Sequence, residues 1–336
     1  MATIQDIAMA VGVAKSTVSR ALREDTTLSI KEETKAKIFE TAQQMGYKVK
    51  REKLLSGARS VVVVHKDTHF LNQIDNAYYF SIRYGIEQEC LKRGIQCSFM
   101  PYGFFKQLPA YINGAIALGS FHEEEVKNMI EATHNVPLSF IGKMNHTPHL
   151  TDWITYDVKG SVDVAMDYLA HLGFSRVLYV GGEDTEGTPL EYQKVFYFRR
   201  FLEEHPEFEC LGVLEGQHGA ESGYQMMKKW IEENEELPQV VFASYDPIAF
   251  GVLRALTEKE IAVPGEVSVI SMNGDGPGES TAPPLTTVDI HAEEMGREAV
   301  RCLEERLNKE RMLTKKVVYP PSLIERSSVK SLKVAD

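Results

Sequence analysis

The sequence is poor in the features that identify secreted, metal-binding or membrane proteins. It has four cysteines in 336 residues: Cys90, Cys97, Cys210 and Cys302. None belongs to a C-x-x-C pair, so neither a zinc ribbon nor a disulfide framework is indicated. The N-terminus has no apolar segment typical of a signal peptide, and the run VVVV at 61–64 is far too short to span a membrane. We therefore expect a protein of the reducing cytoplasm that makes no membrane contact.

Sequence motifs of catalysis and nucleotide binding are also missing. There is no G-x-S-x-G, no H-E-x-x-H, no Walker loop and no strand-linked G-x-G-x-x-G. The Gly-rich stretch NGDGPGES at 273–280 precedes Pro283 and Pro284 rather than a helix whose N-terminus could hold phosphate. The ten histidines show no metal-ligand spacing. The sequence thus predicts neither an enzyme nor a bound cofactor or metal.

The charge of the chain is divided unevenly along its length. The formal net charge is −11, which taken alone argues against binding to nucleic acid. Residues 1–59, however, contain eleven Lys plus Arg against seven Asp plus Glu, or +4, which leaves 26 against 41, or −15, for the rest. A basic first segment on an acidic body is expected when one small domain meets phosphate and the remainder does not.

The first 46 residues predict a small helical domain. In TIQDIAMAVGVAKSTVSRAL, at 3–22, two apolar stripes at helical spacing flank Gly12. Thr3 and Asp6 have the spacing of a capping box. Two short helices joined by a Gly-containing turn form the helix-turn-helix unit, whose second helix enters the DNA major groove. A third helix is expected in SIKEETKAKIFETAQQMGY, at 29–47.

From Ser60 onward, short apolar runs alternate with helical stripes. This pattern occurs twice in succession, first through IQCSFM and GAIALG and again through RVLYVGG, QVVFAS and VSVISM. Strands that alternate with helices imply β-α-β units and parallel sheets. The expected fold class is therefore α/β: a three-helix headpiece followed by a two-lobed core with parallel sheets and a ligand cleft between the lobes.

Several of these stretches together resemble one protein family. TIQDIAMAVGVAKSTVSRAL and KEETKAKIFETAQQMGY resemble the headpiece of the lactose/galactose repressor (LacI/GalR) family. The similarity continues through AYYFSIRYGIE, RVLYVGG, SYDPIAFGVLRAL, VSVISMNGDGPGESTAPPLTTVDIHAEEMG and PPSLIERSS. Within the family, the body of the chain is most similar to repressors of galactoside operons.

The resemblance implies a bacterial, nucleoid-associated regulator with a periplasmic-binding-protein-like core. Such a protein binds pseudo-palindromic operator DNA as a homodimer and is released by a small sugar or sugar-derivative effector. The headpiece is expected at 1–46 and the hinge at 47–59. The N-lobe is expected at 60–157 with 290–316, and the C-lobe at 158–289 with 317–330.

By position in the family motif, five residues of the second helix are expected to contact DNA. Lys15, Ser16 and Arg20 would face base edges, where the Arg20 guanidinium can present two donors to guanine or phosphate. Thr17 and Ser19 would donate to phosphate, which positions the protein without specifying sequence.

Two features of this region depart from the family pattern. Ala14 stands where the family usually has the Ser that caps the recognition helix. The hinge, YKVKREKLLSG, lacks the usual Pro-Asn pair. Leu55 matches the leucine that wedges into the minor groove at the operator centre, although Leu54 could take that role.

The resemblance also places residues in the effector cleft. Asp246, in SYDPIAFG, matches an aspartate expected to accept hydrogen bonds from sugar hydroxyls, and Asn273 occupies a second position usually held by aspartate. Tyr78 and Tyr79 could supply a face for a pyranose ring.

Two further positions of the cleft depart from the family. Tyr192 stands where an arginine normally clamps the sugar. Lys143 follows Gly142, which replaces a common acidic residue.

Three alternatives stay open at this point. A soluble sugar-binding protein without DNA activity would share the core but would not need a basic headpiece. An α/β enzyme acting on a sugar would need a nucleophile or an acid/base pair, and none is found. A regulator that responds to a corepressor rather than an inducer would have the same sequence features.

Overall fold

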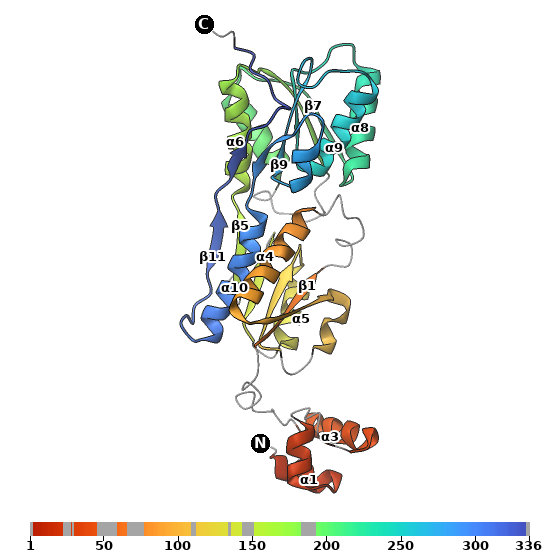
Figure 1. Cartoon of the computed structure of the whole chain (residues 1–336), viewed down its shortest axis with the longest axis vertical. Coiled ribbons are helices and arrows are strands. Elements are labelled where there is room, and N and C mark those ends of the chain that lie inside the picture. The colour runs from red at the N-terminus through yellow and green to blue at the C-terminus, as the bar shows by residue number, and fades with distance from the viewer. Residues whose placement is uncertain are drawn as a thin grey trace. The chain divides into compact units, whose positions relative to one another are not determined.

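The computed structural model describes residues 3–22, 28, 30–45, 59–65, 77–108, 112–133, 136–142, 151–182 and 193–333. The chain divides into two compact units, Met1–Arg59 and Ser60–Asp336. We call the first unit the headpiece and the second the core. The core contains two α/β lobes, which we call the N-lobe and the C-lobe (Figure 1).

The described headpiece contains the three helices α1 (Ile4–Val11), α2 (Lys15–Ala21) and α3 (Glu32–Gln44). The capping box predicted for α1 is confirmed, since the Asp6 N–H donates to Thr3 Oγ1 at 3.3 Å and the Thr3 N–H donates to the Asp6 carboxylate at 2.7 Å. Gly12 ends α1 with φ +75°, a left-handed conformation that glycine adopts without steric penalty. The three helices share one small core, made of Ile7, Ala8, Val18, Ala21, Leu22, Ile38 and Ala42.

The N-lobe is built on a six-stranded parallel sheet with strand order β11-β5-β4-β3-β1-β2. Its strands are β1 (Ser60–His65), β2 (Gln96–Pro101), β3 (Gly114–Leu118), β4 (Leu138–Ile141), β5 (Asp152–Tyr156) and β11 (Lys316–Tyr319). One face packs on the helices α4 (Ala77–Arg93) and α10 (Ala292–Leu307). The other packs on α5 (Glu123–Ala132) and the 3-10 helix η3 (Tyr102–Gln107).

The C-lobe repeats this arrangement with strand order β12-β10-β9-β8-β6-β7. Its strands are β6 (Arg176–Gly182), β7 (Glu209–Gly216), β8 (Val240–Ala243), β9 (Ser268–Asn273), β10 (Thr286–Asp289) and β12 (Ser322–Ile324). β12 runs antiparallel to β10, and the other described pairs are parallel. One face packs on α6 (Val158–His171) and α7 (Lys194–Glu204), the other on α8 (Ala220–Glu233) and α9 (Asp246–Glu258). A short 3-10 helix, η5 (Gly276–Ser280), follows β9.

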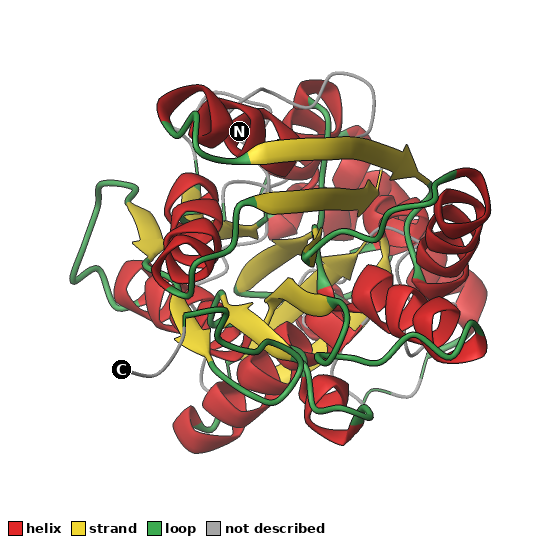
Figure 2. Cartoon of the chain, turned by 90° about the horizontal axis from the view of Figure 1, so that it is seen from above, coloured by secondary structure: helices red, strands yellow, loops and turns green. Residues whose placement is uncertain are grey.

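The continuous apolar runs in the sequence form strands that are buried on both faces. In β1, Val61 and Val63 contact the α4/α10 side, whereas Val62 and Val64 contact the α5 side. Side chains alternate across a strand, so a sheet covered by helices on both faces needs an apolar residue at every position. Figure 2 shows these strands between layers of helices. The expected α/β fold class is thus confirmed.

The chain crosses between the lobes after β5, after β10 and between β11 and β12. β11 lies beside β5 in the N-lobe sheet as far as Tyr319, which pairs with Tyr156. This last crossing therefore comes after the boundary expected at residue 316. Tyr197 of α7 packs against the hydrophobic cluster of each lobe.

Helices α4 and α10 cross at a pair of glycines. A Cβ at Gly85 would collide with the carbonyl oxygen of Glu293, and a Cβ at Gly296 would collide with that of Ile82. The absence of both side chains lets the two backbones touch. This contact fixes the position of α4, whose first turn carries Tyr78 and Tyr79.

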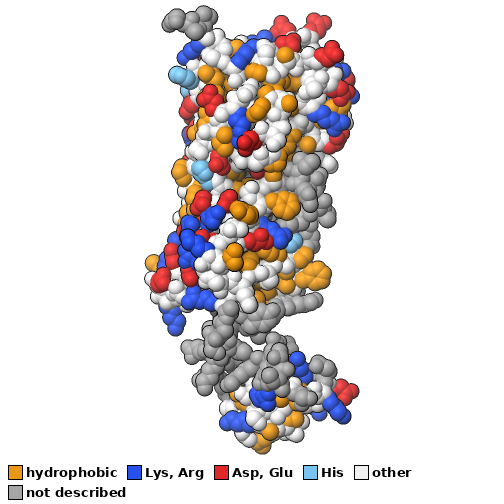
Figure 3. Space-filling view, viewed as in Figure 1, with side chains coloured by type: hydrophobic (Ala, Val, Ile, Leu, Met, Phe, Trp, Pro, Cys, Tyr) orange, Lys and Arg blue, Asp and Glu red, His pale blue; other side chains and the backbone are white. Residues whose placement is uncertain are grey.

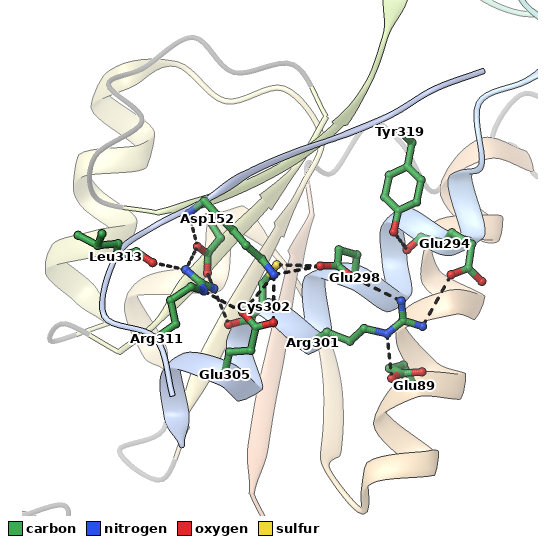
Figure 4. A network of polar contacts seen from close by, with 11 residues as sticks. Glu89, Asp152, Glu294, Glu298, Arg301, Cys302, Glu305, Arg311, Leu313 and Tyr319 are labelled. Atoms are coloured by element: carbon green, nitrogen blue, oxygen red, sulfur yellow. Dashed lines mark hydrogen bonds and ion pairs between the residues drawn. The ribbon is translucent and has the colours of Figure 1, made fainter. Parts of the chain in front are cut away.

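A network of ionic contacts joins α10, β5 and the loop before β11 (Figure 4). Asp152 is fully buried, and its two carboxylate oxygens accept from the Arg311 guanidinium at 2.7 and 2.9 Å. Arg311 also donates to Glu305 at 2.8 Å. The bond to Asp152 raises the pKa of Arg311, so the buried carboxylate keeps a fixed cation beside it.

Candidate DNA interface and ligand site

The second helix of the headpiece turns one face to its own core and the opposite face to solvent. Val18 is fully buried against α1 and α3. Lys15, Ser16 and Arg20 are exposed, while Thr17 and Ser19 are half-buried. Figure 3 shows blue Lys and Arg side chains on the visible face of the headpiece. Because Ser16 and Arg20 lie four residues apart, they share one face of the helix.

Helix α2 begins at Lys15 without a side-chain cap. Ala14 is the N-cap residue and contributes only its carbonyl, which accepts from the N–H groups of Thr17 at 2.9 Å and Val18 at 3.1 Å. A Ser, Thr, Asp or Asn at this position would accept from a backbone N–H of the first turn. The predicted absence of a capping side chain is confirmed.

In the C-lobe, the ends of several parallel strands bring polar groups together around Asp246. This residue opens α9 and is fully buried. Ser271 donates to its Oδ1, as does Thr287 Oγ1 at 2.6 Å. The backbone N–H of Asp275 donates to its Oδ2 at 2.6 Å. Both carboxylate oxygens of Asp246, which was expected to accept hydrogen bonds from sugar hydroxyls, thus already accept hydrogen bonds from the protein.

Asp275 lies directly beside this carboxylate and is 2% exposed. Burial raises the pKa of Asp246 to about 6 and, together with the charge of Asp246, raises that of Asp275 to about 8. Asp246 accepts three hydrogen bonds that favour its anion, whereas Asp275 accepts one long bond, from Asn273 Nδ2 at 3.4 Å. Asp275 is therefore the member of the pair that keeps its proton near neutral pH.

Asn273 ends β9 in a conformation that is unusual for a residue with a side chain. Its φ is +124°, a value that costs energy for any residue except glycine. Strained backbone of this kind concentrates at binding sites, because the surrounding structure must hold it in place. Here the strain directs the chain from β9 into the loop that carries Asp275.

A second polar group lies at the ends of β8 and β7. The Tyr245 hydroxyl accepts from the Gly219 N–H at 3.1 Å and lies 2.5 Å from His218 Nδ1. Lys194 Nζ donates to the Ser244 carbonyl at 2.6 Å and lies 5.3 Å from the centre of the Tyr245 ring. Tyr245 is half-buried and His218 is exposed, so these side chains form a surface with both donors and acceptors.

The N-lobe contributes Tyr78 and Tyr79 from the start of α4. Their ring centres lie 5.0 Å apart in an edge-to-face arrangement, and both side chains are half-buried. Burial raises the pKa of Tyr79 to about 12. Burial also raises the pKa of Tyr78, and the neighbouring Tyr156 and Asp275 add to this shift. Tyr78 of the N-lobe thus lies close to Asp275 of the C-lobe.

Two other kinds of site were sought in the described part of the chain. Within it, no three His, Cys, Asp or Glu side chains gather in an arrangement that could hold a metal ion. No helix there is long and apolar enough to cross a membrane.

Comparison with known proteins identifies the family. Residues 3–49 match the model of bacterial regulatory proteins of the lacI family, and residues 166–329 match the periplasmic binding protein-like domain. The HTH-type transcriptional repressor MelR of Bacillus subtilis is 33% identical over 98% of this chain and 97% of its own length. The chain belongs to the lacI family. The HTH-type transcriptional regulator GalR of Lacticaseibacillus casei is 30% identical over 98% of this chain and 99% of its own.

Solved structures have the same fold as this LacI-family protein. The lac repressor dimer bound to operator and the anti-inducer ONPF gives a TM-score of 0.69 at 19% identity, covering 97% of this chain and 98% of that one. The complex of the regulator CelR with cellobiose gives a TM-score of 0.68 at 21% identity, covering 98% of this chain and 100% of that one. Members of the family are transcriptional regulators, which agrees with the prediction that this chain is a DNA-binding regulator and not an enzyme.

The structure brings some of the predicted site residues of this LacI-family chain together and leaves others outside the described residues. The exposed face of α2 carries Lys15, Ser16 and Arg20, three of the five residues expected to contact DNA. Asn273 lies beside Asp275, to which Tyr78 is also close. The remaining predictions, Leu55 or Leu54, Tyr192 and Lys143, lie outside the described residues.

Four residues of the candidate ligand site were not predicted: Lys194, His218, Tyr245 and Asp275. A signal existed for two of them. Tyr245 directly follows the strand QVVFAS, and Asp275 follows the strand VSVISM in NGDG. Both are at the carboxyl ends of parallel strands, where α/β proteins bind ligands. His218 precedes α8 and Lys194 begins α7, and these helices cover opposite faces of the C-lobe sheet. The fold brings both residues to Tyr245 at the end of that sheet, and this proximity cannot be predicted from a sequence pattern.

Proposed function

We propose that this LacI-family regulator is a repressor of a carbohydrate-utilisation operon that leaves its operator when a small sugar binds. The names of its relatives support this assignment, since MelR is described as a repressor and GalR as a regulator. The observation that carries the proposal is the coexistence, in one chain, of an exposed basic helix face and a polar site at the strand ends of the core.

The proposed DNA-binding species is a homodimer with one headpiece on each half of a pseudo-palindrome. Two-fold symmetry in the protein imposes two-fold symmetry on its operator. Arg20 and Lys15 would contact base edges, and Ser16 would lie beside them on the same exposed face. Thr17 and Ser19, which are half-buried, would donate to phosphate.

The proposed effector is an uncharged polyhydroxyl molecule. At neutral pH the protonated carboxyl of Asp275 can both donate and accept, as can the Tyr245 hydroxyl, and such groups match sugar hydroxyls. Tyr78 would offer an aromatic face from the N-lobe. Asp246 is fully buried and already accepts three hydrogen bonds from the protein, so it would act by holding the Asp275 loop in place. The similarity to CelR in complex with cellobiose is consistent with a sugar-sized ligand.

The test selects DNA that binds the full-length protein from a random-sequence pool and then measures its affinity by fluorescence anisotropy. Sugars and sugar phosphates are added one at a time. The expected result is a pseudo-palindromic site whose affinity falls when one neutral sugar is present. Equal affinity for selected and scrambled DNA would refute the DNA-binding assignment. A sugar that tightens binding would instead identify a corepressor-dependent regulator.

A further inference from the structure

A cavity of about 190 Å³ lies where the chain passes from the N-lobe sheet into the C-lobe. The N-lobe contributes Trp153 and Thr155 of β5 together with Lys316 and Val318 of β11. The C-lobe contributes the first residues of α6 and Tyr197 of α7. Both lobes therefore form the walls of this cavity.

The cavity follows from the way the helices cover the N-lobe sheet. Side chains of β11 alternate between the two faces, and Val317 and Tyr319 pack against the cluster beneath α4 and α10. Lys316 and Val318 belong to the opposite face and are exposed. The described cluster beneath α5 contains no residue of β11. Within the described part of the chain, α5 therefore leaves this edge of the sheet uncovered.

The candidate ligand site described above lies elsewhere. Tyr78 and Tyr79 belong to α4, on the opposite face of the N-lobe sheet from Trp153. Asp246 and Asp275 of the C-lobe do not line the cavity. The cavity is thus a second place at which a small molecule can contact both lobes.

Trp153 gives the cavity a wall of fixed orientation. Its Nε1 donates to the Gly142 carbonyl at 2.8 Å, and the residue is 6% exposed. Lys316 Nζ lies 4.0 Å from the centre of the indole ring, whose electron-rich face attracts the ammonium group. An aromatic surface and a cation are therefore held next to each other in the lining.

The other charged groups of the lining have partners within α6. Lys159 Nζ donates to the Asp163 carboxylate at 2.5 Å. The Asp157 carboxylate accepts from the Gly160 N–H at 2.9 Å. Among the described residues, no carboxylate forms an ion pair with Lys316. Lys316 is therefore the charged group of the lining that a ligand can neutralise.

We propose that this cavity binds a small aromatic carboxylate, whose ring contacts Trp153 and Tyr197 and whose charge pairs with Lys316. An apolar cavity of about 150 Å³ holds benzene, so the volume of about 190 Å³ accommodates one ring that carries a carboxylate. A phosphate group would need several charged donors or an arginine fork, and the lining contains no arginine.

A ligand in this cavity would touch residues of both lobes. It stabilises the arrangement of the lobes in which Trp153 of one and Tyr197 of the other are within its reach. The inference concerns this cavity alone and does not depend on the proposed operator or effector.

Tryptophan fluorescence offers a direct assay, because the chain has two tryptophans and the other, Trp230, is buried in the C-lobe. The full-length Trp230→Phe variant keeps Trp153 as its single tryptophan. Its fluorescence is titrated with benzoate and, separately, with benzamide, which has the same shape but no charge. The expected result is a saturable change with benzoate, with a Kd of about 0.1–1 mM, and binding of benzamide that is weaker by about tenfold or more.

The native chain is measured in parallel by saturation-transfer NMR of the benzoate protons. This measurement needs no substitution, so a failure of Trp230→Phe to fold does not affect it.

Three variants locate the binding site. Lys316→Met removes the charge and keeps the length of the side chain, so it should weaken benzoate binding about tenfold, and Lys316→Arg should restore the affinity. Val318→Trp places an indole at the cavity and should abolish binding. Lys229→Met is the matched control, because it removes an exposed charge from α8, and it should bind benzoate as the native chain does.

Three results would overturn the proposal. The first is a native chain that shows no saturable binding of benzoate up to about 10 mM. The second is binding of benzamide as tight as that of benzoate. The third is native affinity for benzoate in Lys316→Met or in Val318→Trp.

Discussion

The backbone N–H of Asp275 donates to Oδ2 of Asp246 at 2.6 Å, so the loop after β9 is attached to the first residue of α9. Both carboxyl groups are buried, which raises the pKa of each, and the charge of Asp246 raises the pKa of Asp275 further. The three hydrogen bonds to Asp246 stabilise its ionised form, so Asp246 ionises more readily than Asp275. This arrangement gives the proposed ligand site one carboxylate that holds the loop after β9 in place and one carboxyl group that stays neutral.

The first prediction concerns pH and stability. The pKa of Asp275 is about 8 in the folded chain, above the ordinary value of 3.8. Between these values the folded chain holds a proton that the unfolded chain has released, so stability falls as pH rises through this window. Asp275→Asn removes the ionisation and should make the protein more stable than native at pH 8, by about 1–3 kcal/mol.

Urea unfolding at pH 5 and pH 8 measures this effect. The difference between native protein and Asp275→Asn should be larger at pH 8 than at pH 5. Glu235→Gln, which alters an exposed carboxylate, should follow the native curve. An Asp275→Asn variant with the native pH dependence would contradict the assignment of the proton to Asp275.

The second prediction separates ligand contact from support of the site. Tyr245→Phe removes one hydroxyl, which lies beside His218 and Gly219, and should weaken the effector response several-fold with little change in melting temperature. Asp246→Asn places an amide opposite three donors and should lower stability by about 1–3 kcal/mol. Induction midpoints and thermal unfolding of both variants would test the distinction, and an unchanged midpoint in Tyr245→Phe would exclude that residue from the site.

The third prediction concerns DNA specificity. Arg20→Ala should cost about 1–3 kcal/mol of operator affinity and relax discrimination at one base pair per half-site. Lys37→Ala removes the same charge from an exposed position on α3. It should weaken binding to all DNA sequences by the same amount, and by less than Arg20→Ala weakens binding to the operator. Anisotropy titrations with single-base operator variants make the comparison. Uniform loss in both variants would mean that Arg20 contacts phosphate alone.

The fourth prediction concerns the uncapped start of α2. Ala14→Ser supplies the missing acceptor and should stabilise the helix by about 1 kcal/mol. Hydrogen exchange of the α2 amides should slow by about fivefold in the full chain. Ala10→Ser, at an exposed position near the end of α1, offers no cap and should give no such protection.

The fifth prediction concerns the buried ion pair of the N-lobe. Arg311→Met removes the bidentate guanidinium from the fully buried Asp152 and leaves it only the Arg306 guanidinium, 3.9 Å away; it should destabilise the core by about 3–5 kcal/mol. Lys127→Met breaks an exposed pair with Glu123 and should change stability little. Denaturant midpoints of the two variants provide the test. Equal midpoints would mean that the network in Figure 4 contributes no more than a surface pair.

The sequence by itself determined the elements of this protein and their class. The spacing of apolar residues and the capping and turn residues at the ends of elements are local properties of the chain. The capping box at Thr3, the turn at Gly12 and the buried strand at 61–64 could therefore all be predicted. The family followed from the same stretches, since a helix-turn-helix motif and the strand-end sequences are contiguous in the chain.

Only the tertiary structure decided which polar groups are available to a ligand. Asp246 has the residue type and the position expected of a sugar ligand, yet Ser271, Thr287 and the Asp275 N–H occupy its oxygens. Those donors come from β9 with the loop after it and from β10, which β-sheet pairing brings to the start of α9. The ion pair between Asp152 and Arg311 has the same origin. Burial and hydrogen-bond partners depend on the whole fold, and a linear pattern of residue types does not contain them.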